Sequence, residues 1–310
     1  MGTNATDTTA GDHHGHGHDG HGHGGPHDHD ELDWDAMGDR LELEGDLAMP
    51  MLDEALAWLG EVCTSWGTTV RTVLDVGSGP GVGACALALA YEDAQVVAVD
   101  PSPELLARAE RRAARFGVDD RVTTMAASLP DGVDEAPEAH LVWASMVIHH
   151  VADPAAALDR LRHRLRPGGL IALAEFADPW RFLPADLDLG RPGLAERVDA
   201  ASAHWIATLG SNGHEGAPPA ALPGAVAAAG LEIVAERVVR HRIDPPLSVD
   251  ARQHVRAHVV RMAEMETDLL DADDRATLET LADPSSPNGI LARPDVFYET
   301  SRRLLALRPT

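Results

Sequence analysis

A glycine-rich turn between an apolar run and a helix-like stretch constrains this chain more than any other feature of its sequence. Residues 73–83 read VLDVGSGPGVG. Glycine accepts positive φ angles and lets a ligand approach the backbone closely. The helix that follows such a turn presents free N–H groups in its first turn. The segment therefore predicts a strand, a tight turn and a helix that together contact a ligand.

Apolar runs that alternate with helical patterns extend from this turn along the chain. Strands are predicted over residues 70–76, 95–99, 121–125, 140–145, 170–176, 231–239 and 298–308. Helices are predicted over residues 82–90, 103–116, 154–164 and 218–229. Strands and helices in alternation form a parallel sheet that is covered on both faces. The predicted fold class is α/β, with a doubly wound, mostly parallel sheet that binds its ligand at the carboxyl ends of the strands.

The remaining segments divide the chain into three predicted parts. Residues 1–31 form a His-rich, low-complexity tail with almost nothing apolar to bury, which predicts disorder. Residues 32–69 form an N-terminal helical segment, because apolar residues recur there at helical spacing. Residues 70–310 form the ligand-binding domain, with helical insertions near residues 178–216 and 244–296 that are candidates for a lid.

The charge of the chain limits its expected partners. It has 50 acidic and 25 basic residues and a formal net charge of −25. Negative charge repels phosphate backbones and anionic lipid headgroups, so we expect neither nucleic acid nor a membrane as partner. No apolar run reaches the roughly 18 residues of a transmembrane helix, and a cytoplasmic location is expected. Cys63 and Cys85 fall in apolar helical stretches and are expected to be buried thiols.

Two acidic residues near the glycine turn indicate the kind of ligand. Asp100 ends the second predicted strand, where a carboxylate can accept hydrogen bonds from both hydroxyls of a ribose. That position fits any adenosine-type ligand, including NAD(P). Dinucleotide turns, however, have the spacing GxGxxG and bind a pyrophosphate, whereas here the spacing is GxGxGxG and Asp75 stands at the end of the strand. A carboxylate in that place opposes a pyrophosphate and favours a ligand with an ammonium and a sulfonium group.

Four motifs in order make the chain resemble the class I S-adenosylmethionine-dependent methyltransferases of the small-molecule type. They are the turn over residues 75–81, the VAVDPS segment around Asp100, the WASMVIHHV segment over residues 143–151 and the LRHRLRPGG segment over residues 161–169. The resemblance implies a seven-stranded Rossmann-like sheet whose strand near residue 300 is antiparallel. It also implies S-adenosylmethionine as cofactor, and methyl transfer to an O, N or C atom of a small molecule.

The resemblance assigns cofactor contacts residue by residue. Those expected around the methionine and ribose portions are Asp75, Gly77, Ser78, Gly79, Gly81 and Asp100. Those expected around the adenine are Pro101, Ser102, Ala126, Ala127 and Ser128, and those expected near the sulfonium are Ser145 and Met146. The chain departs from the family pattern at Met125 and Ala126, where an Asp often precedes the adenine contact. It also departs at His140, where an acid often begins the fourth strand.

Candidate residues for the chemistry follow the fourth and fifth predicted strands. His149 and His150 stand at the carboxyl edge of the sheet, where a His that titrates near neutral pH can take a proton from an acceptor. The alternative is that this pair only packs and hydrogen-bonds the loop. Glu175 could orient an acceptor or only satisfy nearby N–H groups. Three residues of the first insertion could shape a substrate pocket or belong to a helical core: Trp180, His204 and Trp205.

The His-rich tail allows a different function. Neutral imidazoles can bind Ni²⁺, Zn²⁺ or Cu²⁺, with moderate affinity where the tract is flexible. The tail histidines are His13, His14, His16, His18, His21, His23, His27 and His29. The alternative is a solvated tail without metal. Rival functions are an NAD(P)-dependent oxidoreductase on a similar sheet and a metal-binding protein that uses the tail, and the sequence leaves the oligomeric state open.

Overall fold

A seven-stranded sheet organises the computed structural model, which describes residues 34–211, 216–265 and 267–310. Its strands are β1 (Thr72–Val76), β2 (Gln95–Asp100), β3 (Val122–Ala126), β4 (Ala139–Ser145), β5 (Leu165–Phe176), β6 (Leu231–Ile243) and β7 (Tyr298–Pro309). Their order is β3-β2-β1-β4-β5-β7-β6. The first five strands run parallel, and β7 is antiparallel to both of its neighbours. The predicted fold class is confirmed, including the antiparallel strand near residue 300.

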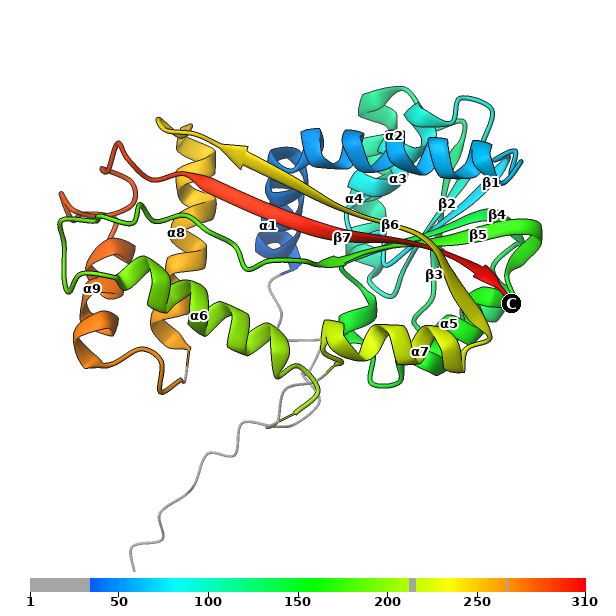
Figure 1. Cartoon of the computed structure of the whole chain (residues 1–310). Helices are drawn as coiled ribbons and strands as arrows, with labels where there is room; N and C mark the ends of the chain where they lie inside the picture. Colours follow the sequence, from blue (N-terminus) through cyan, green and yellow to red (C-terminus); the bar gives the residue numbers. More distant parts are fainter. Residues whose placement is uncertain (1–33, 212–215, 266) are drawn as a thin grey trace, which may run out of the picture. The chain divides into compact units, whose positions relative to one another are not determined.

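Helices cover both faces of this sheet (Figure 1). One face carries α2 (Met49–Ser65), α3 (Val82–Ala90) and α4 (Pro103–Phe116), and the other carries α5 (Pro154–Arg162) and α7 (Leu222–Ala228). The inner strands are buried on both faces, so they read as continuous apolar runs rather than as alternating ones. This is the reason why their positions could be predicted.

Each face of the sheet has its own buried cluster. The cluster under α2 and α3 includes Leu59 and Trp143, and the cluster under α5 and α7 includes Leu158 and Ile171. Cys63 and Cys85 belong to the first cluster and are buried free thiols, as predicted. Burial raises the pKa of the Cys85 thiol to about 11, so this side chain stays protonated and unreactive at neutral pH.

Two strand boundaries differ from the prediction. β5 begins at Leu165 rather than near residue 170, because its first residue already pairs with Ala139 before a shift in register. β6 continues to Ile243 rather than ending at 239, because it pairs with β7 over its whole length. Apolar periodicity does not reveal either extension, since both depend on a partner strand that is distant in sequence.

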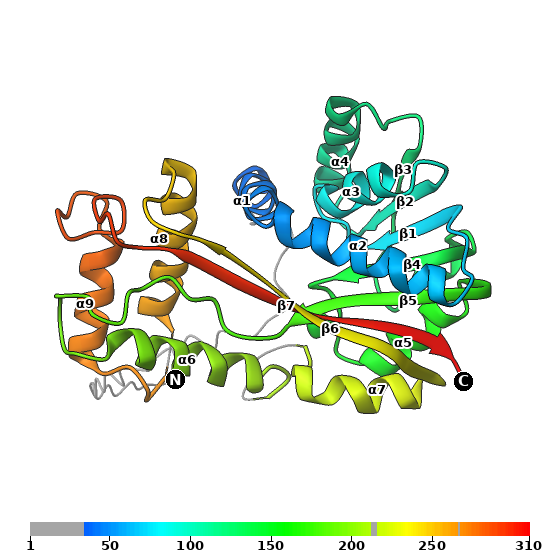
Figure 2. The same ribbon diagram turned by 45° about the horizontal axis from the view of Figure 1, so that its top comes forward.

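The long pair β6 and β7 extends beyond the sheet to a group of helices (Figures 1 and 2). These are α6 (Leu194–Ala207), α8 (Val249–Glu264) and α9 (Ala272–Ala282). They share a third buried cluster that includes Val198, Val259 and Leu278. The helix α6 lies in the range of the first predicted insertion, and α8 and α9 lie in the range of the second. This helical layer stands next to the carboxyl end of β5, where the predicted site is located.

The helix α1 (Trp34–Leu47) connects the two regions (Figure 2). It packs against α4 on one side and against α8 on the other. On the α4 side, the Arg108 guanidinium lies 2.8 Å from the Asp39 carboxylate and 3.1 Å from that of Asp35. The predicted disorder of residues 1–31 lies outside the described residues. Within the described ranges, no helix is both long and apolar enough to cross a membrane.

Candidate functional site

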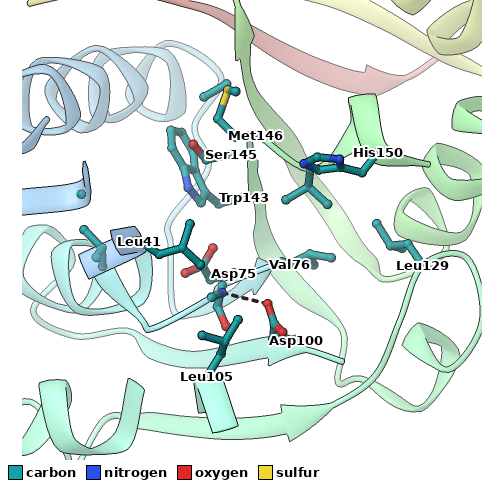
Figure 3. A pocket seen from close by; sticks show the side chains of 18 of the residues that line it. Leu41, Asp75, Val76, Asp100, Leu105, Leu129, Trp143, Ser145, Met146 and His150 are labelled. Atoms are coloured by element: carbon teal, nitrogen blue, oxygen red, sulfur yellow. Dashed lines mark hydrogen bonds between the residues drawn. The ribbon is translucent and has the colours of Figure 1, made fainter. Parts of the chain in front are cut away.

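A cavity of about 810 Å³ lies at the carboxyl ends of β1, β2 and β4, and we refer to it as the glycine-loop cavity (Figure 3). It is lined by most of the residues that the sequence assigns to a cofactor: Asp75, Gly77, Ser78, Gly79, Asp100, Pro101, Ala127, Ser128, Ser145 and Met146. Parallel neighbouring strands end at the same edge of the sheet, which brings these separate segments together. Three predicted residues do not line the cavity: Gly81, Ser102 and Ala126.

Asp100 is held rigidly at the floor of the cavity (Figure 3). Its Oδ2 accepts a hydrogen bond of 2.9 Å from the Gly79 N–H, and its Oδ1 accepts one of 2.9 Å from the Ser102 N–H. Burial raises the pKa of this carboxyl group, and the two N–H donors oppose that rise. A carboxylate has about four acceptor positions, so both oxygens can accept further hydrogen bonds from the two hydroxyls of a ribose.

Of the three predicted residues outside the cavity, two have structural roles and the third is exposed. The Ser102 hydroxyl accepts a hydrogen bond from the Leu105 N–H and caps α4. Ala126 is exposed at the end of β3. Gly81 precedes α3 with a φ of 81°, and a Cβ at this position would lie 2.7 Å from the Cα of Ala109 in α4. The structure therefore places Gly81 where α4 must approach the turn closely, and not against the cavity.

We expect Gly81→Ala to destabilise the fold more than Gly117→Ala does. Both glycines have positive φ, which costs an alanine about 1–2 kcal/mol. A Cβ at Gly117 meets nothing within 4 Å, whereas one at Gly81 overlaps Ala109. Urea unfolding should show an additional loss of roughly 1–3 kcal/mol for the Gly81 variant. Equal losses in the two variants would mean that α4 moves away from the turn at no cost.

Asp75 is a buried carboxylate with an unsatisfied oxygen. It is 2 % exposed, it lines the glycine-loop cavity, and its Oδ2 has no hydrogen-bond partner among the described residues. Burial and the charge of the nearby Asp100 together raise its pKa to about 7, against the opposing effect of the hydrogen bond from the Ala84 N–H. An unpaired buried acceptor is costly, so this oxygen indicates a cationic or hydrogen-bond-donating ligand group.

Glu175, near the end of β5, fixes the loop that follows β4. Its Oε1 accepts hydrogen bonds from the N–H groups of Val147, at 3.1 Å, and Ile148, at 2.8 Å. Its Oε2 lies 2.6 Å from the Nδ1 of His149. Both side chains are buried, at 6 % exposure for His149 and 3 % for Glu175. A single carboxylate therefore holds two backbone donors and one imidazole, and the His149 Nε2 has no partner within the described part of the chain.

The two histidines differ in their surroundings. The His149 ring lies between the rings of His150 and Phe176, with centroids 4.0 and 4.7 Å away. His150 is exposed and has no carboxylate of its own. Partial burial lowers the pKa of His150, and His149 lowers it further, so the His150 imidazole is neutral at pH 7.

A second cavity of about 900 Å³ adjoins the first, and we refer to it as the aromatic cavity. Its aromatic and His lining residues are His149, His150, Phe176, Trp180, Phe182, His204, Trp205 and His258. The two cavities share four lining residues, namely Leu41, Glu44, Met146 and His150. The three insertion residues that could shape a pocket, Trp180, His204 and Trp205, therefore line one. Met146, with a φ of 59°, lies where the cavities meet.

Sequence reasoning missed the contribution of α1 and α8. Leu41 and Glu44 of α1 line both cavities, while Arg40 of α1 and Arg261 of α8 line the aromatic cavity. These side chains come from helices without a sequence motif, so only their packing against the sheet reveals their role. No group of three or more His, Cys, Asp or Glu side chains among the described residues could hold a metal ion. The tail histidines His13 to His29, for which metal binding and a solvated tail are the two alternatives, lie outside those residues.

Similarity to known proteins agrees with this arrangement. A family model described as a methyltransferase domain matches residues 74–171. The chain is 30% identical over 242 residues to a trans-aconitate 2-methyltransferase of Methylobacterium radiotolerans. This alignment covers 73% of this chain and 85% of that protein. The chain is 32% identical over 126 residues to the tRNA 5-carboxymethoxyuridine methyltransferase of Escherichia coli K12, in an alignment that covers 39% of this chain and 47% of that protein.

A solved structure also aligns with most of the chain. It is a methyltransferase from Geobacter sulfurreducens in complex with S-adenosyl-L-homocysteine. The alignment covers 83% of this chain and 91% of that one, at 22% identity and a TM-score of 0.45. The family is established by the relative from Methylobacterium radiotolerans, because the similarity at 30% identity covers 73% of this chain. The chain belongs to the class I S-adenosylmethionine-dependent methyltransferases, and the NAD(P)-dependent alternative is set aside.

S-adenosylmethionine is the cofactor of this family, and the residues of the glycine-loop cavity fit it. The unpartnered Oδ2 of Asp75 suits the ammonium group, and the free acceptor positions of Asp100 suit the ribose hydroxyls. Leu105 and Leu129 supply apolar lining for an adenine ring. A pyrophosphate, by contrast, would meet two carboxylates in the same cavity.

We expect the affinity for S-adenosylhomocysteine to rise roughly tenfold between pH 6 and pH 8. The ionised fraction of an acid with a pKa of about 7 changes by about that factor over this range. The ionised Asp75 attracts the ligand's ammonium group, so binding lowers the pKa of Asp75 and releases a proton. Titration calorimetry at several pH values measures this effect. Asp75→Asn should bind more weakly and with a flat pH profile, and an unchanged profile in this variant would assign the effect to another group.

Proposed function

We propose that this methyltransferase transfers the methyl group to a small organic acceptor that binds in the aromatic cavity. The observation that carries this proposal is the junction of the two cavities at Met146 and His150. A volume of about 900 Å³ is in the range of small-molecule sites. The relative from Methylobacterium radiotolerans is named for a small organic acid, which supports an acceptor of this size.

The protein's part in methyl transfer is orientation and exclusion of water. The bound cofactor supplies a methyl group on an electrophilic sulfonium. The aromatic cavity orients the acceptor with rigid side chains, since Phe176 packs edge-on against Trp180, at 5.4 Å between centroids, and against Trp205, at 6.3 Å. Met146 and Ser145 line the cofactor side of the junction.

His149 and Glu175 are well placed to remove a proton from the acceptor. The carboxylate accepts the hydrogen on Nδ1, which leaves the lone pair on Nε2 of His149 free to take a proton. After proton transfer, Glu175 stabilises the charged imidazole. This arrangement favours an acceptor that must lose a proton, such as a hydroxyl group. His150 lies at the junction, where its neutral imidazole ring lines both cavities.

The test is transfer of label from methyl-labelled S-adenosylmethionine to a panel of small phenols, hydroxy acids, amines and unsaturated acids. We expect labelled product from at least one class, in an amount that depends on an intact Asp100. Labelling of bulk tRNA with no labelling of any small molecule would overturn the proposed acceptor class. The negative net charge argues against a nucleic-acid acceptor. The cytoplasmic location stays a prediction, and both alternatives for the His-rich tail, metal binding and a solvated tail, stay open.

A further inference from the structure

Two arginines line the aromatic cavity, and neither has a carboxylate partner in the part of the chain that the structure describes. Arg40 comes from α1 and Arg261 from α8, and both are half-buried. Arg40 donates a hydrogen bond to the Met37 sulfur, and neither guanidinium lies within 4.0 Å of an acid among the described residues. Arg108 of α4, by contrast, lies within 3.4 Å of three acids of α1.

Two acids also line the aromatic cavity, but neither forms an ion pair with these arginines within the described residues. The Oε1 of Glu44 lies 3.6 Å from the Arg302 guanidinium, and Glu264 is exposed at the end of α8. Burial lowers the pKa of Arg261 and the charge of Arg40 lowers it further, whereas the charges of Glu44 and Glu264 raise it. Two neighbouring cations in a half-buried cavity repel each other, and a bound anion would relieve this repulsion.

Arg261 is also held in place. One of its Nη2 hydrogens is donated to the Nδ1 of His258, so the proton of this neutral ring resides on Nε2. That Nε2 then donates to the Nε2 of His254 over 3.0 Å. Burial keeps the pKa values of both histidines low, so they support the guanidinium as neutral rings. The remaining N–H donors of Arg261 have no hydrogen-bond partner among the described residues, so they can bind a ligand.

We infer that the methyl acceptor is an organic acid whose carboxylate binds Arg40 and Arg261, with a planar apolar body against Trp180 and Trp205. The two oxygens of a carboxylate match the fork of a guanidinium in a bidentate hydrogen bond. The aromatic side chains supply flat apolar surface beside the arginines. This inference rests on the proposed function, because it assigns the same cavity to the acceptor.

The test is calorimetric titration of the protein saturated with S-adenosylhomocysteine. The probes are three acids and their neutral amides, namely benzoate and benzamide, cinnamate and cinnamide, and 1-naphthoate and 1-naphthamide, together with trans-aconitate. We expect at least one acid to bind about 10- to 100-fold more tightly than its amide, or trans-aconitate to bind, because charge-assisted hydrogen bonds have that strength. Arg40→Gln and Arg261→Gln should each weaken acid binding by about tenfold or more and leave amide binding unchanged.

Arg111→Gln is the matched control, because it removes the same charge from an exposed position of α4 that lines neither cavity. The inference is overturned if no acid is preferred over its amide and trans-aconitate does not bind. It is also overturned if the cavity variants bind acids as tightly as the control does. Titration with S-adenosylhomocysteine distinguishes failure of the assigned acid from failure of the proposed function. If the cofactor product binds and neutral acceptors are methylated, only the assignment of an acid is lost.

Discussion

Asp100→Ala is expected to weaken the binding of S-adenosylhomocysteine by at least about a hundredfold. The wild-type carboxylate has acceptor positions left for both ribose hydroxyls, because Gly79 and Ser102 occupy only one position on each oxygen. Each hydrogen bond to a charged group contributes about 1.5–3 kcal/mol, and the loss of two such bonds exceeds the 2.7 kcal/mol that corresponds to about a hundredfold. Titration calorimetry of the purified variant measures the change.

The same substitution leaves the N–H groups of Gly79 and Ser102 without an acceptor. Thermal unfolding must therefore show that the variant is folded at the titration temperature before its affinity is interpreted. Asp119→Ala is a matched control, since Asp119 is exposed and lines neither cavity, and the charge change is the same. A folded Asp100 variant with wild-type affinity would show that the sugar binds elsewhere.

Glu175→Gln is expected to lower kcat by about 10²–10⁴, the range that a positioned general base contributes. Glutamine keeps an oxygen for the Val147 and Ile148 N–H groups, so the loop after β4 should hold its place. Its amide nitrogen, however, faces Nδ1 of His149 as a donor, which moves the ring hydrogen to Nε2 and removes the free lone pair. The affinity for S-adenosylhomocysteine should stay close to the wild-type value.

His149→Ala tests the same pair from the other side. We expect a loss of kcat similar to that of Glu175→Gln, and a double variant only slightly worse than either single one, because the two residues act as a unit. His150→Ala should mainly raise the KM, because His150 lines both cavities without a carboxylate partner. If Glu175→Gln retains the wild-type kcat over the pH range of activity, Glu175 only holds the loop.

The sequence was sufficient for those parts of the site that lie close to a strand end. Asp75, Gly77 and Gly79 belong to one local unit of strand, turn and helix, and Asp100 ends the next strand, so their positions follow from the topology of a parallel sheet. The prediction of Ser102 follows from the same logic. Its position beside Asp100 is right, but its hydroxyl is used to cap α4.

The aromatic cavity could not be predicted in the same way. Arg40 and Leu41 come from α1, Trp205 from α6 and Arg261 from α8, and these helices meet only after the chain has folded. Amphipathic helices show which residues face a core, but the pattern does not state which helix is the partner. For the same reason, the pairing of His149 with Glu175 depends on β4 and β5 being neighbours in the sheet.

By itself, the sequence determined the α/β class and a cofactor with an adenosyl group and positive charge. Both follow from short-range features, namely apolar strands, a glycine turn and the acids at strand ends. Only the tertiary structure decided what lines the proposed acceptor site: the carboxylate that holds His149, and two guanidinium groups without an ion-pair partner in the described part of the chain. Contacts between segments that are distant in the chain are set by packing of whole helices and strands, and no local pattern of residues encodes them.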